Sequence, residues 1–298
     1  MLLICPNDGS YANRLLYAHE RTEGWCMAGL LVAAALAAAT PGAPPPTAIP
    51  ANAEPAIFMV RDADTTIYIF GTFHALDGKS EWFKNQVKNA FERSDELVLE
   101  TLIPEGPAKP AAPGQAPQQL RPFVVAPSAS FLASTRMAIT AGRSQGMQVN
   151  NGADMVLRRV AEAEGKQVEG LETLESQLSM FSHLPPPAPA PAATAAPQAA
   201  NPAPAMNSLS KSMAEMQSAW KRGDQAVFVR VLGQLERASP DTYRMMFTER
   251  NARWADWIRA RMQTPGTVFV AVGAGHLAGK DSVLVKLAQR GIPSQRVY

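Results

Sequence analysis

One arrangement occurs twice in this chain: an apolar run that ends in Gly-x-x-His. The first copy runs from Thr66 to His74, and the second runs from Val268 to His276. β-Branched and aromatic residues are frequent in both runs, which favours β-strands. A glycine three residues before the histidine lets the backbone turn as it leaves the strand. The repeat therefore predicts two strands that each present a histidine at the carboxyl end.

The first copy is preceded by a strand and followed by a helix and a strand. Residues 56–60 and 66–70 flank a polar turn and predict a hairpin. Residues 80–93 carry apolar side chains at helical spacing, with Ser80 as the expected N-cap, and residues 96–100 predict the next strand.

The second copy repeats this order near the end of the chain. Residues 282–290 predict a helix that ends at Gly291, and a last strand is expected near residues 295–298. Strand–helix–strand segments imply crossover connections between parallel strands. We therefore expect an α/β fold with a mixed, largely parallel sheet built from two strand–GxxH–helix–strand units.

Helical patterns and two segments of biased amino-acid composition lie between the two strand–GxxH–helix–strand units. Residues 155–164 and 174–181 predict helices around a short strand, 167–171, that ends at Glu172. Helical periodicity also runs from 206 to 261 and predicts a helical subdomain. Two segments, residues 104–122 and 185–205, are rich in Pro and Ala, a composition typical of flexible insertions.

The N-terminal 53 residues resemble a secretory leader. Residues 27–39 are apolar over a stretch too short for a typical membrane span, and Ala51-Asn-Ala53 has the form of a processing site. We expect a mature N-terminus near Glu54 and a periplasmic or secreted domain, 54–298. The alternatives are an uncleaved leader that anchors the chain in the inner membrane, and a translation start at Met27. In either case this segment is the expected membrane contact.

The net charge and the placement of the cysteines limit the kinds of binding site that the exported domain can have. Of 28 basic and 26 acidic residues, two basic and three acidic ones lie in residues 1–53, which leaves 26 against 23 in the remainder. A net charge of +3 does not indicate nucleic-acid binding. Both cysteines, Cys5 and Cys26, belong to the leader. The exported domain would therefore have neither a disulfide nor a thiolate metal ligand.

The paired histidines point to a metal centre. Neutral imidazole is the commonest metal ligand, and parallel strands place their carboxyl ends at one edge of a sheet. Glu100 ends its own strand and would add a carboxylate, and Glu172 would be a fourth N/O group. Such a set suits a divalent Zn, Mn or Co ion with an open position for water.

Ordinary structural roles compete with each of these assignments. A strand-end histidine often satisfies a local carbonyl, Glu100 could be an exposed charge, and Glu172 could simply begin the next helix. Arg250 and Asn251 lie on a predicted helix, where they could orient a carboxylate or a substrate carbonyl or could belong to a solvated face. The sequence contains no His-Glu-x-x-His and no phosphate-binding glycine loop.

Several of these segments together resemble the TraB/GumN family, which is related to the Tiki proteases. The resemblance rests on residues 70–76, 97–101, 170–173 with Gln177, 250–251 and 272–279. It implies an α/β core and, by analogy with the Tiki proteins, a metal-dependent peptidase that uses the GxxH histidines and a glutamate. The two Pro/Ala insertions depart from the compact family pattern.

We therefore expect an exported metal-dependent hydrolase, a peptidase, that acts on a peptide or protein. In this hypothesis His74 and His276 are metal ligands, and Glu100 is a ligand or the general base. Glu172 is a further ligand, Arg250 supports catalysis and Asn251 binds substrate. The alternative is a non-catalytic envelope binding protein that serves polysaccharide or signal-peptide traffic.

Overall fold

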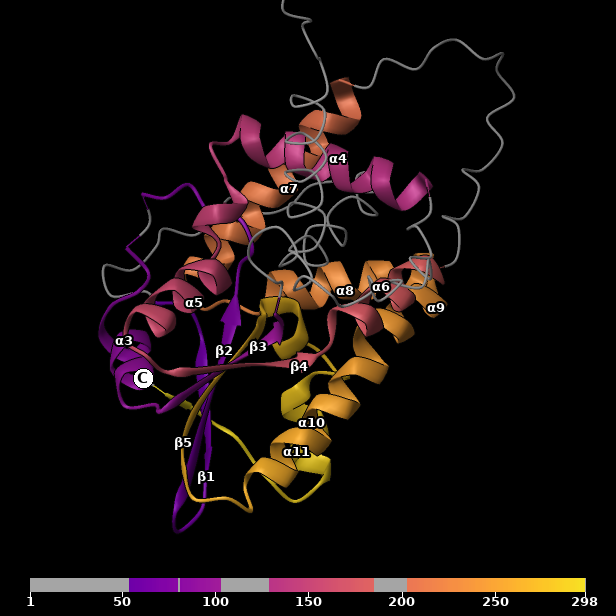
Figure 1. Cartoon of the computed structure of the whole chain (residues 1–298). Helices are drawn as coiled ribbons and strands as arrows, with labels where there is room; N and C mark the ends of the chain where they lie inside the picture. Colours follow the sequence, from indigo (N-terminus) through magenta and orange to yellow (C-terminus); the bar gives the residue numbers. More distant parts are fainter. Residues whose placement is uncertain (1–53, 80, 103–128, 185–202, 298) are drawn as a thin grey trace, which may run out of the picture.

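A computed structural model describes residues 54–79, 81–102, 129–184 and 203–297 of the chain, which form an α/β structure around one six-stranded sheet (Figure 1). The predicted leader, 1–53, and the first predicted insertion, 104–122, lie outside these residues. The second insertion, 185–205, lies outside them up to residue 202. Its last three residues instead begin a helix, α7.

The sheet is mixed and mostly parallel, which confirms the predicted fold class. Its strands are β1 (Ile57–Arg61), β2 (Thr65–Thr72), β3 (Glu96–Thr101), β4 (Gln167–Glu172), β5 (Gly266–Gly273) and β6 (Gln295–Val297). They lie in the order β4-β3-β5-β2-β1-β6. The first four in this order are mutually parallel, and β1 pairs antiparallel with both β2 and β6. The two GxxH strands, β2 and β5, are therefore direct neighbours.

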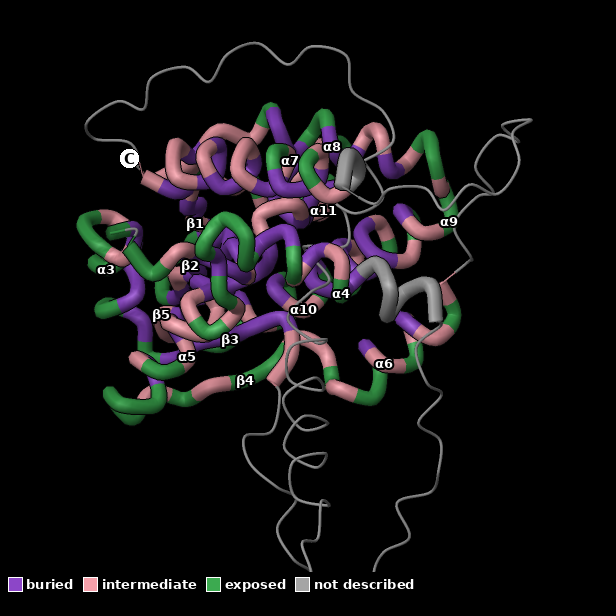
Figure 2. Tube along the Cα trace, turned by 90° about the horizontal axis from the view of Figure 1, so that it is seen from above, coloured by how far each residue is buried: buried purple, intermediate pink, exposed green. Residues whose placement is uncertain are grey.

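Helices cover both faces of the sheet. They are α3 (Asn85–Glu92), α4 (Ala129–Ser144), α5 (Ala153–Ala163), α6 (Leu174–Ser182), α7 (Ala203–Lys221), α8 (Ala226–Ala238), α9 (Pro240–Tyr243), α10 (Glu249–Arg261) and α11 (Val283–Gln289). Short 3₁₀ turns lie at Val149–Asn151 and Ala274–Leu277, and a π-helical turn lies at Arg244–Thr248. Figure 2 shows buried residues in the central strands, exposed and intermediate residues along the edge strand β4, and exposed outer faces on helices such as α7 and α8.

The alternation of side chains along each strand divides the core in two. On β2, Ile67 and Ile69 pack with residues of α10 and α11. Tyr68 and Phe70 face the opposite way and pack with α3, α5, α7 and α8. Helices from the predicted 206–261 subdomain thus contribute to both cores, so this segment packs as part of the main fold.

Two helices differ from the sequence expectation. The helix predicted over 80–93 begins only at Asn85, with Lys84 at the N-cap instead of Ser80. Trp82 is drawn into the core, where its ring stacks on Phe70 with 5.6 Å between centroids. This contact outweighs the local preference for another helical turn. The helix at Ala129–Ser144 was not predicted, and its Ser144 hydroxyl lies 3.2 Å from that of Ser210 in α7.

Within the described ranges no helix is both long enough and apolar enough to cross a membrane.

The Trp220 indole of α7 makes a buried hydrogen bond to the backbone of the first GxxH segment. This contact leads to a stability prediction. The indole Nε1–H donates to the Gly71 carbonyl at 2.6 Å in the buried interior. Trp220→Phe should cost about 1–3 kcal/mol in the free energy of unfolding, because the carbonyl loses a buried donor. Urea denaturation measures this. Val229→Ala on α8, where Val229 is 47% exposed, is the control and should change stability by less than about 0.5 kcal/mol. Equal effects of the two variants would contradict the prediction.

Candidate functional site

Both GxxH histidines and Glu100 lie around the backbone of Gly273 at the carboxyl edge of the sheet. A Cβ atom placed on Gly273 would lie 3.0 Å from His74 Nε2, 3.1 Å from Glu100 Oε1 and 3.6 Å from His276 Cδ2. The parallel register explains the meeting, since Thr72 at the end of β2 pairs with Gly273 at the end of β5. The structure therefore brings three predicted site residues from distant parts of the sequence to one point.

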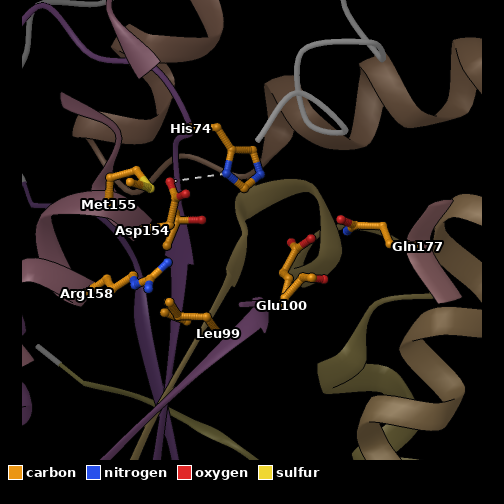
Figure 3. A pocket seen from close by; sticks show the side chains of 10 residues that line it. His74, Leu99, Glu100, Asp154, Met155, Arg158 and Gln177 are labelled. Atoms are coloured by element: carbon orange, nitrogen blue, oxygen red, sulfur yellow. Dashed lines mark hydrogen bonds and ion pairs between the residues drawn. The ribbon is translucent and has the colours of Figure 1, made fainter. Parts of the chain in front are cut away.

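Asp154 orients the His74 ring. His74 Nδ1 lies 3.2 Å from Asp154 Oδ1, the contact drawn as a dashed line in Figure 3. With Nδ1–H donating to the carboxylate, Nε2 carries its lone pair toward Gly273 and Glu100. Burial lowers the pKa of His74, but the charge and hydrogen bond of Asp154, with a contribution from Glu100, outweigh burial and leave that pKa raised. The imidazole is thus a strengthened proton acceptor.

A tight backbone contact places Asp154 beside His74. Ala153 N–H at the start of α5 donates to the Phe73 carbonyl at 2.9 Å. A Cβ on the preceding residue, Gly152, would lie only 2.3 Å from the His74 carbonyl oxygen, so only glycine fits. Asp154 was not predicted, because an acidic residue at a helix start is a common stabilising feature with no functional meaning of its own.

Glu100 is held as a buried, ionised carboxylate. Gly273 N–H donates to Oε1 at 2.6 Å, and Arg250 Nη2 donates to Oε2 at 3.0 Å. Burial raises the pKa of Glu100. The charges of Arg250, His276 and His74 and the Gly273 hydrogen bond outweigh burial and lower that pKa to about 2. Glu100 therefore carries a negative charge throughout the physiological pH range.

Arg250 lies at the centre of the buried polar cluster, with 0% of its surface exposed. Its Nε donates to both oxygens of Glu172, at 3.1 and 3.0 Å, and its guanidinium lies 4.6 Å from the centroid of the Trp254 ring. Nη1 lies 3.3 Å from His276 Nε2. Burial lowers the pKa of Arg250, but the charges of Glu100 and Glu172 outweigh burial and raise it. One guanidinium thus fixes three of the predicted site residues.

Glu172 is occupied by protein donors. Besides Arg250, Trp254 Nε1–H donates to its Oε1 at 3.2 Å, and Arg253 Nη2 lies 3.3 Å from the same oxygen. Its carboxylate therefore accepts hydrogen bonds from three side chains of α10, those of Arg250, Arg253 and Trp254.

His276 is neutral and has a defined tautomer. Its Nδ1–H donates to Asn251 Oδ1 at 2.6 Å, and Asn251 Nδ2–H donates to the Asp281 carbonyl at 2.8 Å, which orients the amide. Burial, together with the charge of Arg250, lowers the pKa of His276 to about 3, although Glu100 acts in the opposite direction. Asn251, predicted to bind substrate, is buried behind His276 and uses its amide to hold that ring.

A small pocket opens beside His74 and Glu100, with a cavity volume of ≈ 40 Å³. Figure 3 shows Asp154, Met155 and Arg158 of α5 on one side and Gln177 of α6 on the other, with Glu100 between them. The pocket is lined by Thr72, His74, Leu99, Glu100, Thr101, Asp154, Met155, Arg158, Gln177 and Ala271. Of the predicted site residues, His74 and Glu100 line this pocket, while Arg250, Asn251, Glu172 and His276 do not.

Two of the predicted metal ligands, His74 and Glu100, are placed as ligands of one ion would be. His74 Nε2 and Glu100 Oε1 face the same space above Gly273, where a Cβ is missing. His276 Nε2, the expected third ligand, lies 3.8 Å from Glu100 Oε1, but it also lies 3.3 Å from Arg250 Nη1, which occupies its lone pair. Across the described residues no group of three His, Cys, Asp or Glu side chains is arranged to hold a metal ion. A catalytic zinc centre uses three protein ligands, so the arrangement is one ligand short.

The comparison with known families agrees with the sequence. The family model described as the TraB/PrgY/gumN family matches residues 56–121 and 114–296. The chain belongs to the TraB/PrgY/gumN family. This confirms the resemblance drawn from the sequence, and the matched residues of this TraB/PrgY/gumN protein include both GxxH segments and Glu100. No curated protein and no solved structure matches the chain.

The close approach of Gly152 to the His74 carbonyl leads to a prediction about stability. Gly152→Ala should lower the free energy of unfolding by about 1–3 kcal/mol, because the new methyl group overpacks against the His74 backbone. Gly233→Ala in α8 is the control. Its Cβ would meet only Arg237 Nη1, at 3.5 Å, and alanine in a helix should stabilise by up to about 1 kcal/mol. Urea denaturation of both variants measures the difference, and a neutral Gly152→Ala would contradict the proposed contact.

The buried guanidinium leads to a second stability prediction. Arg250→Met should cost about 3–5 kcal/mol, because it leaves Glu100 and Glu172 buried without a counter-charge. The triple variant Arg250→Met, Glu100→Gln, Glu172→Gln should recover part of this loss, since the unpaired charges are then removed. Arg253→Met is the control, because this side chain is 60% exposed and its ion pair is worth little. Denaturant titrations that gave Arg250→Met and Arg253→Met the same stability would refute the central role of Arg250.

Proposed function

We propose that this TraB/PrgY/gumN protein is a hydrolase of amide or ester bonds, with peptides as its substrates. The observation that carries the proposal is the placement of His74 Nε2 and Glu100 Oε1 around one small space beside an open pocket. A water molecule in that space would meet two acceptors, one for each of its protons. General-base activation of water requires an acceptor within hydrogen-bond reach of the proton that is removed, and the second acceptor would orient the water.

His74 is the proposed general base. Asp154 holds its Nδ1–H, so Nε2 is the nitrogen that accepts a proton from water, as in other base–orienter pairs. Glu100 accepts the second water hydrogen and stabilises the imidazolium that forms. Gly273 N–H and Arg250 hold that carboxylate in place. Arg250, His276, Glu172 and Asn251 act in this proposal as positioning residues.

The second candidate is the metal-dependent form of the same reaction. In it, His74 Nε2 and Glu100 Oε1 would hold a divalent Zn, Mn or Co ion, and His276 would supply a third ligand. Such an ion, when bound, would lower the pKa of its coordinated water. The shared orientation of the first two donors favours this candidate, and the engagement of His276 with Arg250 weighs against it.

The cellular setting is also a proposal. The A-x-A site after the apolar stretch of residues 27–39 supports export to the periplasm or secretion, with membrane contact only through the leader. A non-catalytic envelope binding protein is the alternative function.

The test compares Glu100 with a matched glutamate on the same strand. The full chain is assayed for hydrolysis of fluorescently labelled casein and of 4-nitrophenyl acetate. Glu100→Gln should lower the rate by about 10²–10⁴-fold, because the positioned acceptor is lost. Glu96→Gln is the control, because Glu96 pairs with Arg261, near the amino-terminal end of β3. A wild-type chain no faster than Glu100→Gln on both substrates would contradict the hydrolase and favour the envelope binding protein.

A chelator separates the two catalytic candidates. Activity that survives EDTA would support His74 as the base without a metal. Activity lost in EDTA and restored by Mn²⁺ or Zn²⁺ would support the metal-dependent form. Calorimetric titration of the same ions should then show binding that His74→Ala abolishes, a readout independent of turnover.

A further inference from the structure

Two threonine hydroxyls beside the pocket are buried and unpaired. Thr72 is 2% exposed, and neither its Oγ1 nor that of Thr101 has a hydrogen-bond partner within the part of the chain that the structure describes. A buried hydroxyl without a partner lowers stability, so such groups are uncommon in native structures and indicate a role. Both residues line the pocket that contains His74 and Glu100.

The strand register places these hydroxyls on either side of Gly273. Thr72 on β2 pairs with Gly273 on β5, and Leu99 on β3 pairs with Ala271 two residues earlier on β5. Thr101, two residues after Leu99, is therefore at the level of Gly273. Residues two apart share a face of the sheet, and neighbouring strands are about 4.8 Å apart. The two threonines thus flank the position where Gly273 has no side chain.

The site needs hydrogen-bond donors, and these hydroxyls can supply them. His74 Nε2 and Glu100 present acceptors to the space above Gly273. Two strong donors next to this space are already engaged, because Gly273 N–H and Arg250 Nη2 both donate to Glu100. A substrate carbonyl oxygen needs donors when it becomes an oxyanion, and a threonine hydroxyl can donate.

We infer that Thr72 and Thr101 bind the carbonyl oxygen of the scissile amide or ester and stabilise its oxyanion. This rests on the proposed function. The water oxygen bonds to the carbonyl carbon while one water proton moves to His74 Nε2. The C=O π pair moves onto oxygen, and the two hydroxyls donate to that oxyanion. The intermediate then re-forms C=O and breaks the bond to the leaving amine or alcohol, which takes the proton from His74.

The experiment uses two threonines whose hydroxyls have no partner among the described residues, one that lines the pocket and one that does not. Thr135 on α4 is 3% exposed, and its Oγ1 also has no partner in the described residues. Thr72→Val, Thr72→Ser and Thr135→Val are made in the full chain. Hydrolysis of 4-nitrophenyl acetate gives kcat and KM, and calorimetry gives the Kd of 4-nitrophenyl methylphosphonate, a tetrahedral anionic analogue of the same ester. Thermal unfolding gives Tm.

Thr72→Val should lower kcat by about 100-fold with little change in KM, and should weaken phosphonate binding by a similar factor. Its Tm should not fall, because the variant removes an unpaired polar group and keeps the shape. Thr72→Ser should retain most of the activity, and Thr135→Val should match the wild type in kcat and Kd. A loss that appeared only with a lower Tm, or an equal loss in Thr72→Ser, would indicate packing and overturn the inference.

The outcomes separate this inference from the proposed function. An active wild type whose kcat and phosphonate affinity survive Thr72→Val would overturn the hydroxyl site and leave the hydrolase intact. An inactive wild type that binds the phosphonate, and loses that binding in Thr72→Val, would overturn the hydrolase and keep the anion-binding hydroxyls. An inactive wild type that does not bind the phosphonate would overturn both.

Discussion

The arrangement of the site depends on one buried ion-pair network centred on Arg250. Its guanidinium contacts Glu100 from β3, Glu172 from β4 and His276 from the turn after β5. A buried carboxylate without a counter-charge costs several kcal/mol, so these groups are tolerated in the interior only together. The arginine therefore fixes how α10 is placed against three strand ends. It also keeps Glu100 ionised, with its other oxygen directed at Gly273.

Close backbone contacts set the position of the remaining groups. Gly152 lets α5 approach the His74 carbonyl, and this approach places Asp154 beside the His74 ring. Gly273 leaves room for His74 Nε2 and Glu100 Oε1 in front of the β5 backbone. A hydrolytic site at this edge would thus have a base, an ionised carboxylate and two hydroxyls that no described residue engages, all held by the scaffold before substrate arrives. Such preorganisation is what stabilises a transition state at low cost.

The sequence patterns predicted the strands well and the helices less evenly. The runs ending in Gly-x-x-His are the neighbouring strands β2 and β5, because β-branched and aromatic residues favour a buried sheet position. The start of α3 was predicted too early, since Trp82 leaves the helical path to stack on Phe70. The helix at Ala129–Ser144 was missed altogether, and its contact with α7 is a long-range one.

The sequence by itself determined the fold class, the family and the placement of His74, Glu100 and His276 at strand ends, since strand patterns and glycine turns are local properties. Only the tertiary structure decided what each side chain contacts. It buried Arg250 and Asn251 outside the pocket lining, brought Asp154 to His74, and left the Thr72 and Thr101 hydroxyls without a hydrogen-bond partner among the described residues. The reason is physical: hydrogen bonds and ion pairs between residues distant in the chain depend on strand order and helix docking, and no local pattern records either.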